Sequence, residues 1–241
     1  MVLRILSYNI HGLPWIQCPI EAILLWAYVK CRCDILCLQE VFSRKLRNKL
    51  VTLAPKYGFS IYFAPAEPCC LGKSLLGFFT PCGLCILVKN TIPLIDGPHF
   101  QQFYSKGGLD SLVNKGVLSL SILYENKTIQ ILNTHFQADF NELPCCSVKY
   151  HDIRRSQEAQ LYHIASKYEF PLIFGDFNKN HFQFFERFDD SHQITFPSTG
   201  EHLDHFLVFR NHICRLLFRN TTYFSDVLFS DHFPVLFEFT F

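Results

Sequence analysis

The chain has 241 residues, of which 49% are hydrophobic and 18% are charged. This composition excludes an intrinsically disordered chain and supplies enough apolar material for a large core. The 22 basic and 21 acidic residues give a net charge of +1, which argues against a strongly basic protein that binds any nucleic acid through its phosphates. Because there is no internal repeat, low-complexity tract or long polar linker, we expect residues 1–241 to form a single domain.

Targeting and membrane-spanning signals are missing from the sequence. No stretch of about twenty apolar residues predicts a membrane span, and no basic segment followed by an apolar run predicts a signal peptide. The 11 cysteines are an odd number, which favours reduced thiols over disulfides. A zinc site at Cys31 and Cys33, or at Cys82 and Cys85, is the weaker alternative because neither pair has a partner pair at the usual spacing. We therefore expect a cytoplasmic protein that is at most peripherally bound to a membrane.

Apolar patterning predicts alternating strands and helices. Helical spacing predicts a helix opened by Pro19, a second helix capped by Ser43, and a third over residues 151–167. Short apolar runs predict strands at residues 3–8, 34–39, 59–64, 83–88, 117–124, 129–134, 171–174, 203–209 and 233–239. Several strands follow one another directly, so the pattern indicates an α/β fold with mixed sheets.

Polar side chains stand at the ends of five of these predicted strands. Carboxylate, amide and imidazole groups that end buried strands commonly build a site at one rim of a sheet. Each residue taken alone has a structural explanation, such as a satisfied histidine, a solvated glutamate or a polar turn. The residues at the five ends are Asn9, Glu40, His135, Asp176 with Asn178, and Asp231 with His232.

Together these residue types suit the cleavage of phosphate esters. Carboxylates are hard oxygen ligands suited to Mg²⁺, and histidines are bases near neutral pH. Asparagines can orient a water molecule or a phosphoryl oxygen. A metal, a base and neutral donors are what an activated water needs to attack phosphorus.

The motifs around these residues resemble those of the endonuclease/exonuclease/phosphatase superfamily. Six segments match in family order and cover nearly the whole chain: Ser7-Tyr8-Asn9-Ile10, Leu38-Gln39-Glu40-Val41, Asn133-Thr134-His135, Gly175-Asp176-Phe177-Asn178, Leu203-Asp204-His205 and Ser230-Asp231-His232-Phe233-Pro234-Val235. The resemblance implies a DNase I-like four-layer α/β sandwich, in which two packed mixed β-sheets are flanked by helices. It also implies a Mg²⁺-dependent phosphoric diester hydrolase.

The resemblance implies roles for the metal and base residues. Glu40 is expected to be the main Mg²⁺ ligand with Asn9 beside it, and Mn²⁺ is an expected substitute. His232 is expected to be the general base, oriented by Asp204. Asp231 is expected to support the metal site and the attacking water.

It also implies roles on the phosphate side. Asp176 and Asn178 are expected to position the nucleophile and stabilise the transition state, and His135 is expected to donate to a phosphoryl oxygen. Residues 110–116 resemble a phosphate-side loop, in which Lys115 contacts the phosphate and pairs with Asp110. Asn178 and His135 are expected to share that phosphate contact.

Within the superfamily, the neutral sphingomyelinase branch is the most similar. Its signature resembles Thr134-His135-Phe136-Gln137-Ala138-Asp139, and Arg154 with Gln157 resembles an Arg-x-x-Gln on the helix that follows. This implies sphingomyelin or a related phospholipid as substrate and a membrane surface as partner; no protein partner is expected. His205 departs from the branch, which usually has an aromatic residue there.

The sequence leaves two candidates for the segment that contacts a membrane and several for the substrate class. Residues 65–82, with Cys69 and Cys70, and the Phe-rich residues 177–188 are candidate interfacial loops. A Mg²⁺-dependent nuclease of the DNase I or abasic-site type is the first alternative, with nucleic acid as partner. Its possible basic face is Arg44, Lys45, Arg47 and Lys49, which otherwise form a solvated helix face. An inositol-phosphate phosphatase, whose Cys-Asp-Arg element is missing, and an inactive binding domain rank lower.

Overall fold

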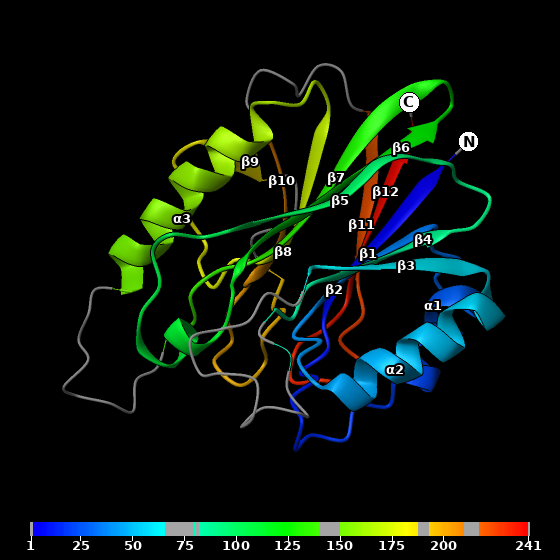
Figure 1. The fold of residues 1–241 in the computed structure, drawn as a ribbon, viewed down its shortest axis with the longest axis horizontal. Coiled ribbons are helices and arrows are strands. Elements are labelled where there is room, and N and C mark those ends of the chain that lie inside the picture. Colours follow the sequence, from blue (N-terminus) through cyan, green and yellow to red (C-terminus); the bar gives the residue numbers. More distant parts are fainter. Residues whose placement is uncertain are drawn as a thin grey trace.

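Two six-stranded mixed sheets pack face to face in the computed structural model (Figure 1). The structure describes residues 2–65, 80, 82–139, 150–187, 193–209 and 217–240, with the backbone alone for 217–219. In the first sheet the order is β11 (Leu217–Tyr223), β12 (Val235–Thr240), β1 (Leu3–Asn9), β2 (Ile35–Gln39), β4 (Cys85–Lys89) and β3 (Phe59–Phe63). In the second sheet the order is β5 (Leu94–Gln102), β6 (Gly116–Tyr124), β7 (Lys127–His135), β8 (Pro171–Asp176), β10 (Asp204–Phe209) and β9 (Phe185–Arg187).

Helices cover the outer faces of both sheets. The helices α1 (Ile20–Val29) and α2 (Arg44–Leu53) lie on the first sheet, and α3 (Tyr150–Ala165) lies on the second (Figure 1). Short 3-10 helices, η1 (Ala54–Tyr57) and η2 (Gly108–Leu112), follow α2 and β5. The four-layer α/β sandwich expected from the motifs is therefore confirmed. None of the helices in the described part of the chain is both long and apolar enough to cross a lipid bilayer.

The side-chain alternation of the strands divides the core into three layers. In β1, Leu3 and Ile5 point between the sheets, whereas Leu6 and Tyr8 point toward α1 and α2. A strand buried on both faces must be apolar at every position, which is why the central strands read as continuous apolar runs. The third layer packs Leu161 and other α3 residues against the outer face of the second sheet.

In α2 the predicted N-cap is confirmed, whereas the predicted solvated basic face is wrong at Arg47. The Ser43 hydroxyl accepts a hydrogen bond from the Leu46 amide at 3.3 Å, as expected for an N-cap. Arg47, however, is buried rather than solvated. Its guanidinium donates to the backbone oxygens of Val41 and Cys82 and lies over the Phe63 ring, so it fixes the loop after β2. Only the remaining cations of this helix face solvent.

The structure describes nearly all of one of the two candidate interfacial loops and leaves most of the other undescribed. Most of residues 65–82, including Cys69 and Cys70, lie outside the described residues. In the segment 177–188, Phe177 and Phe185 are buried, and their neighbours Phe182 and Phe184 pack against the same core layer. Phe182 and Phe184 are half-buried, so the described part of this second segment presents less apolar surface than its composition indicates, and its contact with a membrane stays a prediction.

Parallel pairing brings the polar strand ends to one edge of the sandwich. β1 and β2 run parallel, as do β7 and β8, so Asn9 ends beside Gln39 and His135 ends beside Asp176. A buried amide pair ties the two sheets together at this edge: Gln39 Nε2 donates to Asn133 Oδ1 at 2.7 Å. Asn133 Nδ2 in turn donates to the backbone oxygens of Leu38 and Cys85. The edge that carries the candidate residues is thus rigidly assembled from both sheets.

The described cysteines carry no disulfide. Cys18, Cys31, Cys33, Cys37, Cys82 and Cys85 are all free thiols. Among the described residues, the group with ligand atoms close enough to hold a metal contains carboxylates and a histidine but no cysteine. The geometry of this part of the chain therefore gives the zinc alternative no support.

Candidate active site

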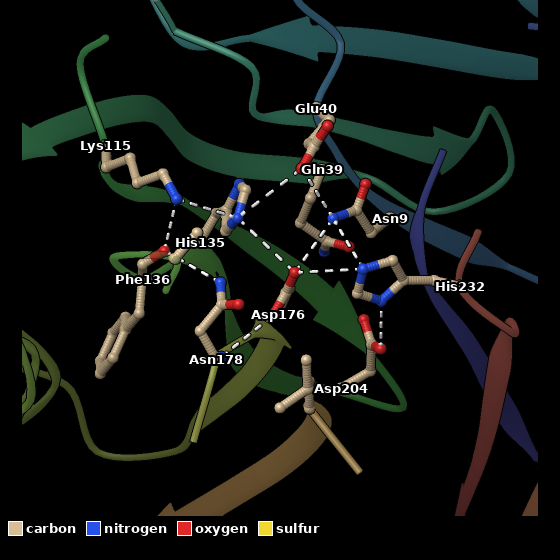
Figure 2. Close-up of polar contacts among 12 residues, drawn as sticks. Asn9, Gln39, Glu40, Lys115, His135, Phe136, Asp176, Asn178, Asp204 and His232 are labelled. Atoms are coloured by element: carbon tan, nitrogen blue, oxygen red, sulfur yellow. Dashed lines mark hydrogen bonds and ion pairs between the residues drawn. The ribbon is translucent and has the colours of Figure 1, made fainter. Parts of the chain in front are cut away.

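A histidine and a carboxylate form a buried dyad at the sheet edge (Figure 2). His232 lies just before β12, and its Nδ1 is 2.8 Å from Oδ2 of Asp204, the first residue of β10. Burial alone lowers the pKa of His232, but the negative charges of Asp204 and then Asp176 overcome it and raise that pKa to about 10. Because Nδ1 is engaged by Asp204, Nε2 is the ring nitrogen that faces the remaining site residues.

Asn9 is the hub of the cluster. Its Nδ2 lies 3.1 Å from Glu40 Oε1, 3.0 Å from Asp176 Oδ2 and 3.5 Å from His232 Nε2 (Figure 2). The His11 amide donates to Asn9 Oδ1 at 3.1 Å, which fixes the orientation of the side-chain amide. In this orientation Asn9 holds the two carboxylates through its NH₂ group and directs its oxygen away from Glu40.

Glu40 and Asp176 are carboxylates in different environments. The Glu40 side chain keeps 20% of its surface exposed, whereas that of Asp176 keeps 2%. Burial, reinforced by Asp204, raises the pKa of Asp176 to about 7, although His232 opposes the shift. Glu40 has a positive φ of 59°, a sparsely populated backbone conformation that is concentrated at functional sites.

The donor chemistry of this edge fits Mg²⁺ best at Glu40. Mg²⁺ prefers one or two carboxylates and keeps several waters, and Glu40 offers a partly exposed hard oxygen for this. Ligand atoms of Asp176, Asp204 and His232 also lie within 4.8 Å of one another, close enough for a metal. However, Asp204 Oδ2 and the imidazole of His232 are paired with each other there, so Glu40 is the more accessible oxygen ligand.

Lys115 joins the phosphate-side loop to the cluster. Its ammonium lies 2.7 Å from Asp110 Oδ2, 2.6 Å from the Phe136 oxygen and 3.1 Å from His135 Nε2. Lysine has three donors, so all three are engaged, and its side chain is only 4% exposed. The expected contact between Lys115 and Asp110 is thus present, and a phosphate can be bound only in place of one of the other two partners.

His135 is held as a neutral ring. Burial, followed by the charge of Lys115, lowers its pKa well below the ordinary value. Because Lys115 can only donate, Nε2 of His135 accepts and the ring proton lies on Nδ1. Its Nε2 is 3.5 Å from Asp176 and 4.0 Å from Glu40, so the expected donation from Nε2 to a phosphoryl oxygen requires the other tautomer.

The remaining two predicted residues lie at the margins. The backbone N–H of Asn178 donates to Asp176 Oδ1 at 3.0 Å. Its side-chain Nδ2 donates to the backbone oxygen of Phe136 at 3.2 Å. Asp231 is exposed, with its carboxylate 3.2 Å from His11 Nδ1. Within the described part of the chain, Asp231 therefore does not join the hydrogen-bonded cluster, although it precedes His232 directly.

The helix α3 braces the loop that follows His135. Gln157 accepts from the Gln137 amide at 2.9 Å and donates to the Ser105 oxygen at 2.9 Å. Arg154 donates to Asp139 Oδ1 at 2.7 Å. The Arg-x-x-Gln pair noted in the sequence thus contacts the same loop whose sequence resembles the sphingomyelinase signature.

Two further rings lie around the candidate site, those of His205 and Phe196. His205 is buried, contacts the Lys179 oxygen at 2.9 Å and packs between Phe177 and Phe182, so it fills the space of the usual aromatic residue. Phe196 lies with its ring centroid 4.7 Å from that of His232. No sequence signal marks Phe196, because it stands in an irregular segment outside every recognised motif.

Comparison with known proteins gives few sequence matches and many structural ones. No protein-family model matches the sequence. Sphingomyelin phosphodiesterase 5 from Danio rerio is 27% identical over 180 residues, which cover 67% of this chain. The match spans 31% of that relative's own length.

Solved structures superpose over essentially the whole chain. Sphingomyelinase C from Streptomyces griseocarneus is 17% identical with a TM-score of 0.73, covering 99% of each chain. A mutant beta toxin from Staphylococcus aureus with bound magnesium ions is 18% identical with a TM-score of 0.74, covering 98% of this chain and 99% of that one. TDP2 from D. rerio with a single-strand DNA product is 13% identical with a TM-score of 0.69, covering 100% and 99%. The chain therefore has the DNase I-like fold of the endonuclease/exonuclease/phosphatase superfamily, as its six motifs indicate, and sphingomyelinases are among its similar structures.

Proposed function

We propose that this chain is a Mg²⁺-dependent phosphodiesterase that hydrolyses sphingomyelin or a related phospholipid. The observation that carries the proposal is the buried Asp204–His232 dyad. Its Nε2 lies 3.5 Å from the side-chain amide nitrogen of Asn9, which is itself bonded to Glu40. A base held by a carboxylate beside a hard oxygen ligand is the arrangement that water attack on phosphorus needs.

In this proposal His232 removes the proton from the attacking water. Its Nδ1 bond to Asp204 orients the ring and stabilises the imidazolium that forms when Nε2 takes the proton. Asp176 and Asn9 border the same nitrogen and position the water in line with the bond that breaks. Phe196 lies against the imidazole ring and limits its movement.

Glu40 is the residue we assign to the metal. Its carboxylate would hold Mg²⁺, which when bound would supply polarisation of the phosphoryl group and neutralise developing negative charge. Asn9 holds the Glu40 carboxylate through its NH₂ group and so orients it. The resemblance places Asn9 beside the metal. Asn9 fits that place if it only orients Glu40, or if its amide turns so that the oxygen faces the metal.

Lys115 and His135 form the phosphate-binding side in this proposal. The Lys115 ammonium brings a positive charge to the edge of the cluster, next to His135 Nε2. An anionic phosphoryl oxygen competes well for such a donor, because hydrogen bonds between charged groups are stronger than those to a neutral ring. Displacing the lysine contact also frees Nε2 of His135 to carry a proton and donate. Asn178 completes this side.

The choice of a phospholipid over nucleic acid depends on the loops around the shared core. Asp110 lies against Lys115, the pairing that the sphingomyelinase resemblance implies, and Gln157 accepts from the backbone N–H of Gln137 in the signature segment. The curated relative is itself a sphingomyelin phosphodiesterase. The similar structure with a single-strand DNA product makes a nuclease the competing function.

A parallel substrate assay separates these functions. The purified protein with Mg²⁺ is given sphingomyelin in mixed micelles and, separately, supercoiled DNA and DNA with an abasic site. We expect phosphocholine release that disappears with EDTA and in the His232→Ala variant. DNA nicking without phosphocholine release would overturn the substrate, and activity that survives both controls would overturn the site.

A further inference from the structure

A surface beside the active site exposes an unusual number of apolar side chains. Fourteen large apolar side chains are exposed in the described part of the chain, and five of them fall within residues 15–29. They are Trp15, Ile16, Leu25, Tyr28 and Val29, and Trp15 has the largest exposed fraction of the five, at 71%. Scattered exposed apolar residues are normal, but a contiguous group of them marks a contact surface.

The helix α2 adds cations to this group. A groove of about 1200 Å³ runs between α1 and α2, lined by Leu25 on one side and Arg44, Lys45 and Lys49 on the other. A smaller groove of about 320 Å³ brings Trp15 and Ile16 together with Lys45 and Lys49. We call this combination the α1–α2 surface; it comprises Trp15, Ile16, Leu25, Tyr28, Val29, Arg44, Lys45 and Lys49.

Charge is concentrated on this side of a nearly neutral protein. Residues 15–57 contain seven lysines and arginines, of which Arg47 is buried, and three acidic residues, whereas the whole chain has a net charge of +1. Of the three acidic residues, Asp34 pairs with Lys89 at 3.2 Å and Glu40 belongs to the active site. Glu21 is therefore the one acidic residue that lines the large groove.

We infer that the α1–α2 surface binds a bilayer containing anionic phospholipids. Aromatic and aliphatic side chains insert shallowly between head groups, and neighbouring lysines and arginines are attracted by the negative surface potential. A second copy of the chain fits less well, because a two-fold contact would place the cations of α2 against each other. Nucleic acid also fits less well, because Leu25 and Val29 offer neither stacking nor hydrogen bonds to bases.

The surface is rigidly connected to the active site. The loop with Trp15 follows Asn9, and α2 follows Glu40, so both parts of the surface begin at the two parallel strand ends that carry site residues. The Ser43 amide donates to the Gly12 oxygen at 3.0 Å, which ties this loop to the start of α2. Docking of the surface therefore places the site edge next to lipid head groups. The inference extends the proposed function, but bilayer binding itself requires no catalysis.

Tryptophan fluorescence tests the inference directly, because the chain has two tryptophans. Trp26 is half-buried against Phe224, so Trp26→Phe leaves Trp15 as the single reporter. With EDTA present, we expect phosphatidylserine–phosphatidylcholine vesicles to shift the Trp15 emission to shorter wavelength and to weaken its quenching by iodide. Pure phosphatidylcholine vesicles should give a much smaller change, and added salt should reverse the effect.

Charge variants supply the matched comparison. Removing two surface cations in Lys45→Gln with Lys49→Gln should weaken vesicle binding by about thirtyfold. Lys127→Gln with Lys167→Gln removes two exposed lysines elsewhere and should leave binding unchanged. Turnover of a short-chain, water-soluble substrate should stay the same in both double variants, while turnover on vesicles should fall only in the first.

Three outcomes would overturn the inference. They are no Trp15 shift with anionic vesicles, equal weakening by the two double variants, and a shift produced by duplex DNA but not by vesicles. Vesicle binding without any phosphocholine release would leave the inference standing and refute the proposed function. Phosphocholine release without vesicle binding would do the reverse.

Discussion

Replacing Asp204 with asparagine removes a buried negative charge from His232 while keeping the size of the side chain. The two residues are joined at 2.8 Å, and both side chains are at most 6% exposed. A hydrogen bond between charged buried groups contributes about 1.5–3 kcal/mol. If the transition state uses all of this, kcat falls by about 10- to 150-fold.

The same substitution should change the pH dependence. Asp204 raises the pKa of His232 against the opposing effect of burial, so its loss lowers that pKa. A general base must be unprotonated to act, and activity therefore rises as the pH passes its pKa. The rising limb of the pH–rate profile should move to lower pH in Asp204→Asn, while the plateau falls.

The assay is phosphocholine release from sphingomyelin micelles over a range of pH. Asp231→Asn is the matched control, because this exposed carboxylate contacts His11 rather than the imidazole of His232. An exposed pair contributes about 0–1 kcal/mol, so the control should lose less than about fivefold in rate. A larger loss in Asp231→Asn than in Asp204→Asn, or an unmoved limb in the latter, would refute the assignment of the dyad.

Three further predictions concern stability and metal binding. Lys115→Ala leaves Asp110 buried without its cation and should lower the free energy of unfolding in denaturant by about 3 kcal/mol. The double variant Lys115→Met with Asp110→Asn removes both charges and should restore most of this loss. Equal losses in the single and double variants would contradict the prediction. Gly175→Ala places a Cβ 2.1 Å from the Thr134 backbone oxygen at a φ of 154°, and should lower the same unfolding free energy by about 3 kcal/mol. An unchanged unfolding free energy would show that the backbone shifts without cost. Glu40→Gln should abolish Mg²⁺ binding in calorimetry, and neither Mg²⁺ nor Mn²⁺ should rescue its activity; wild-type affinity would remove Glu40 from the metal site.

The central strands could be predicted because burial on both faces makes them continuous apolar runs. All nine predicted strands are present, whereas no apolar pattern predicts β5, β9 and β11. These three strands are edges of the two sheets. β5 contains Gly97 and Pro98 and has no buried residue, so neither alternation nor a continuous apolar run marks it. β9 has only three residues, too few for any period.

The site residues could be found because catalytic groups stand at strand ends, but their partnerships could not. The sequence indicated that Glu40, His135, Asp176 and His232 meet at one edge, and the structure brings all four into a single cluster. The orientation of Asn9 depends on its bond to the backbone two residues later, which no sequence pattern reveals.

The other differences between the sequence predictions and the structure arise from long-range packing. Arg47 turns inward because buried backbone oxygens of Val41 and Cys82 need its donors, and helical spacing alone placed it on the basic face. Phe196 reaches His232 from an irregular segment, so no period or motif could have identified it.

Isotope incorporation tests the central claim most directly. Sphingomyelin is hydrolysed in ¹⁸O-labelled water with Mg²⁺, and both products are analysed by mass spectrometry. Attack on phosphorus by a water molecule activated at His232 predicts one ¹⁸O in phosphocholine, none in the ceramide hydroxyl, and no product from His232→Ala or Glu40→Gln. Label in the ceramide hydroxyl, or labelled phosphocholine from either variant at the wild-type rate, would contradict the account.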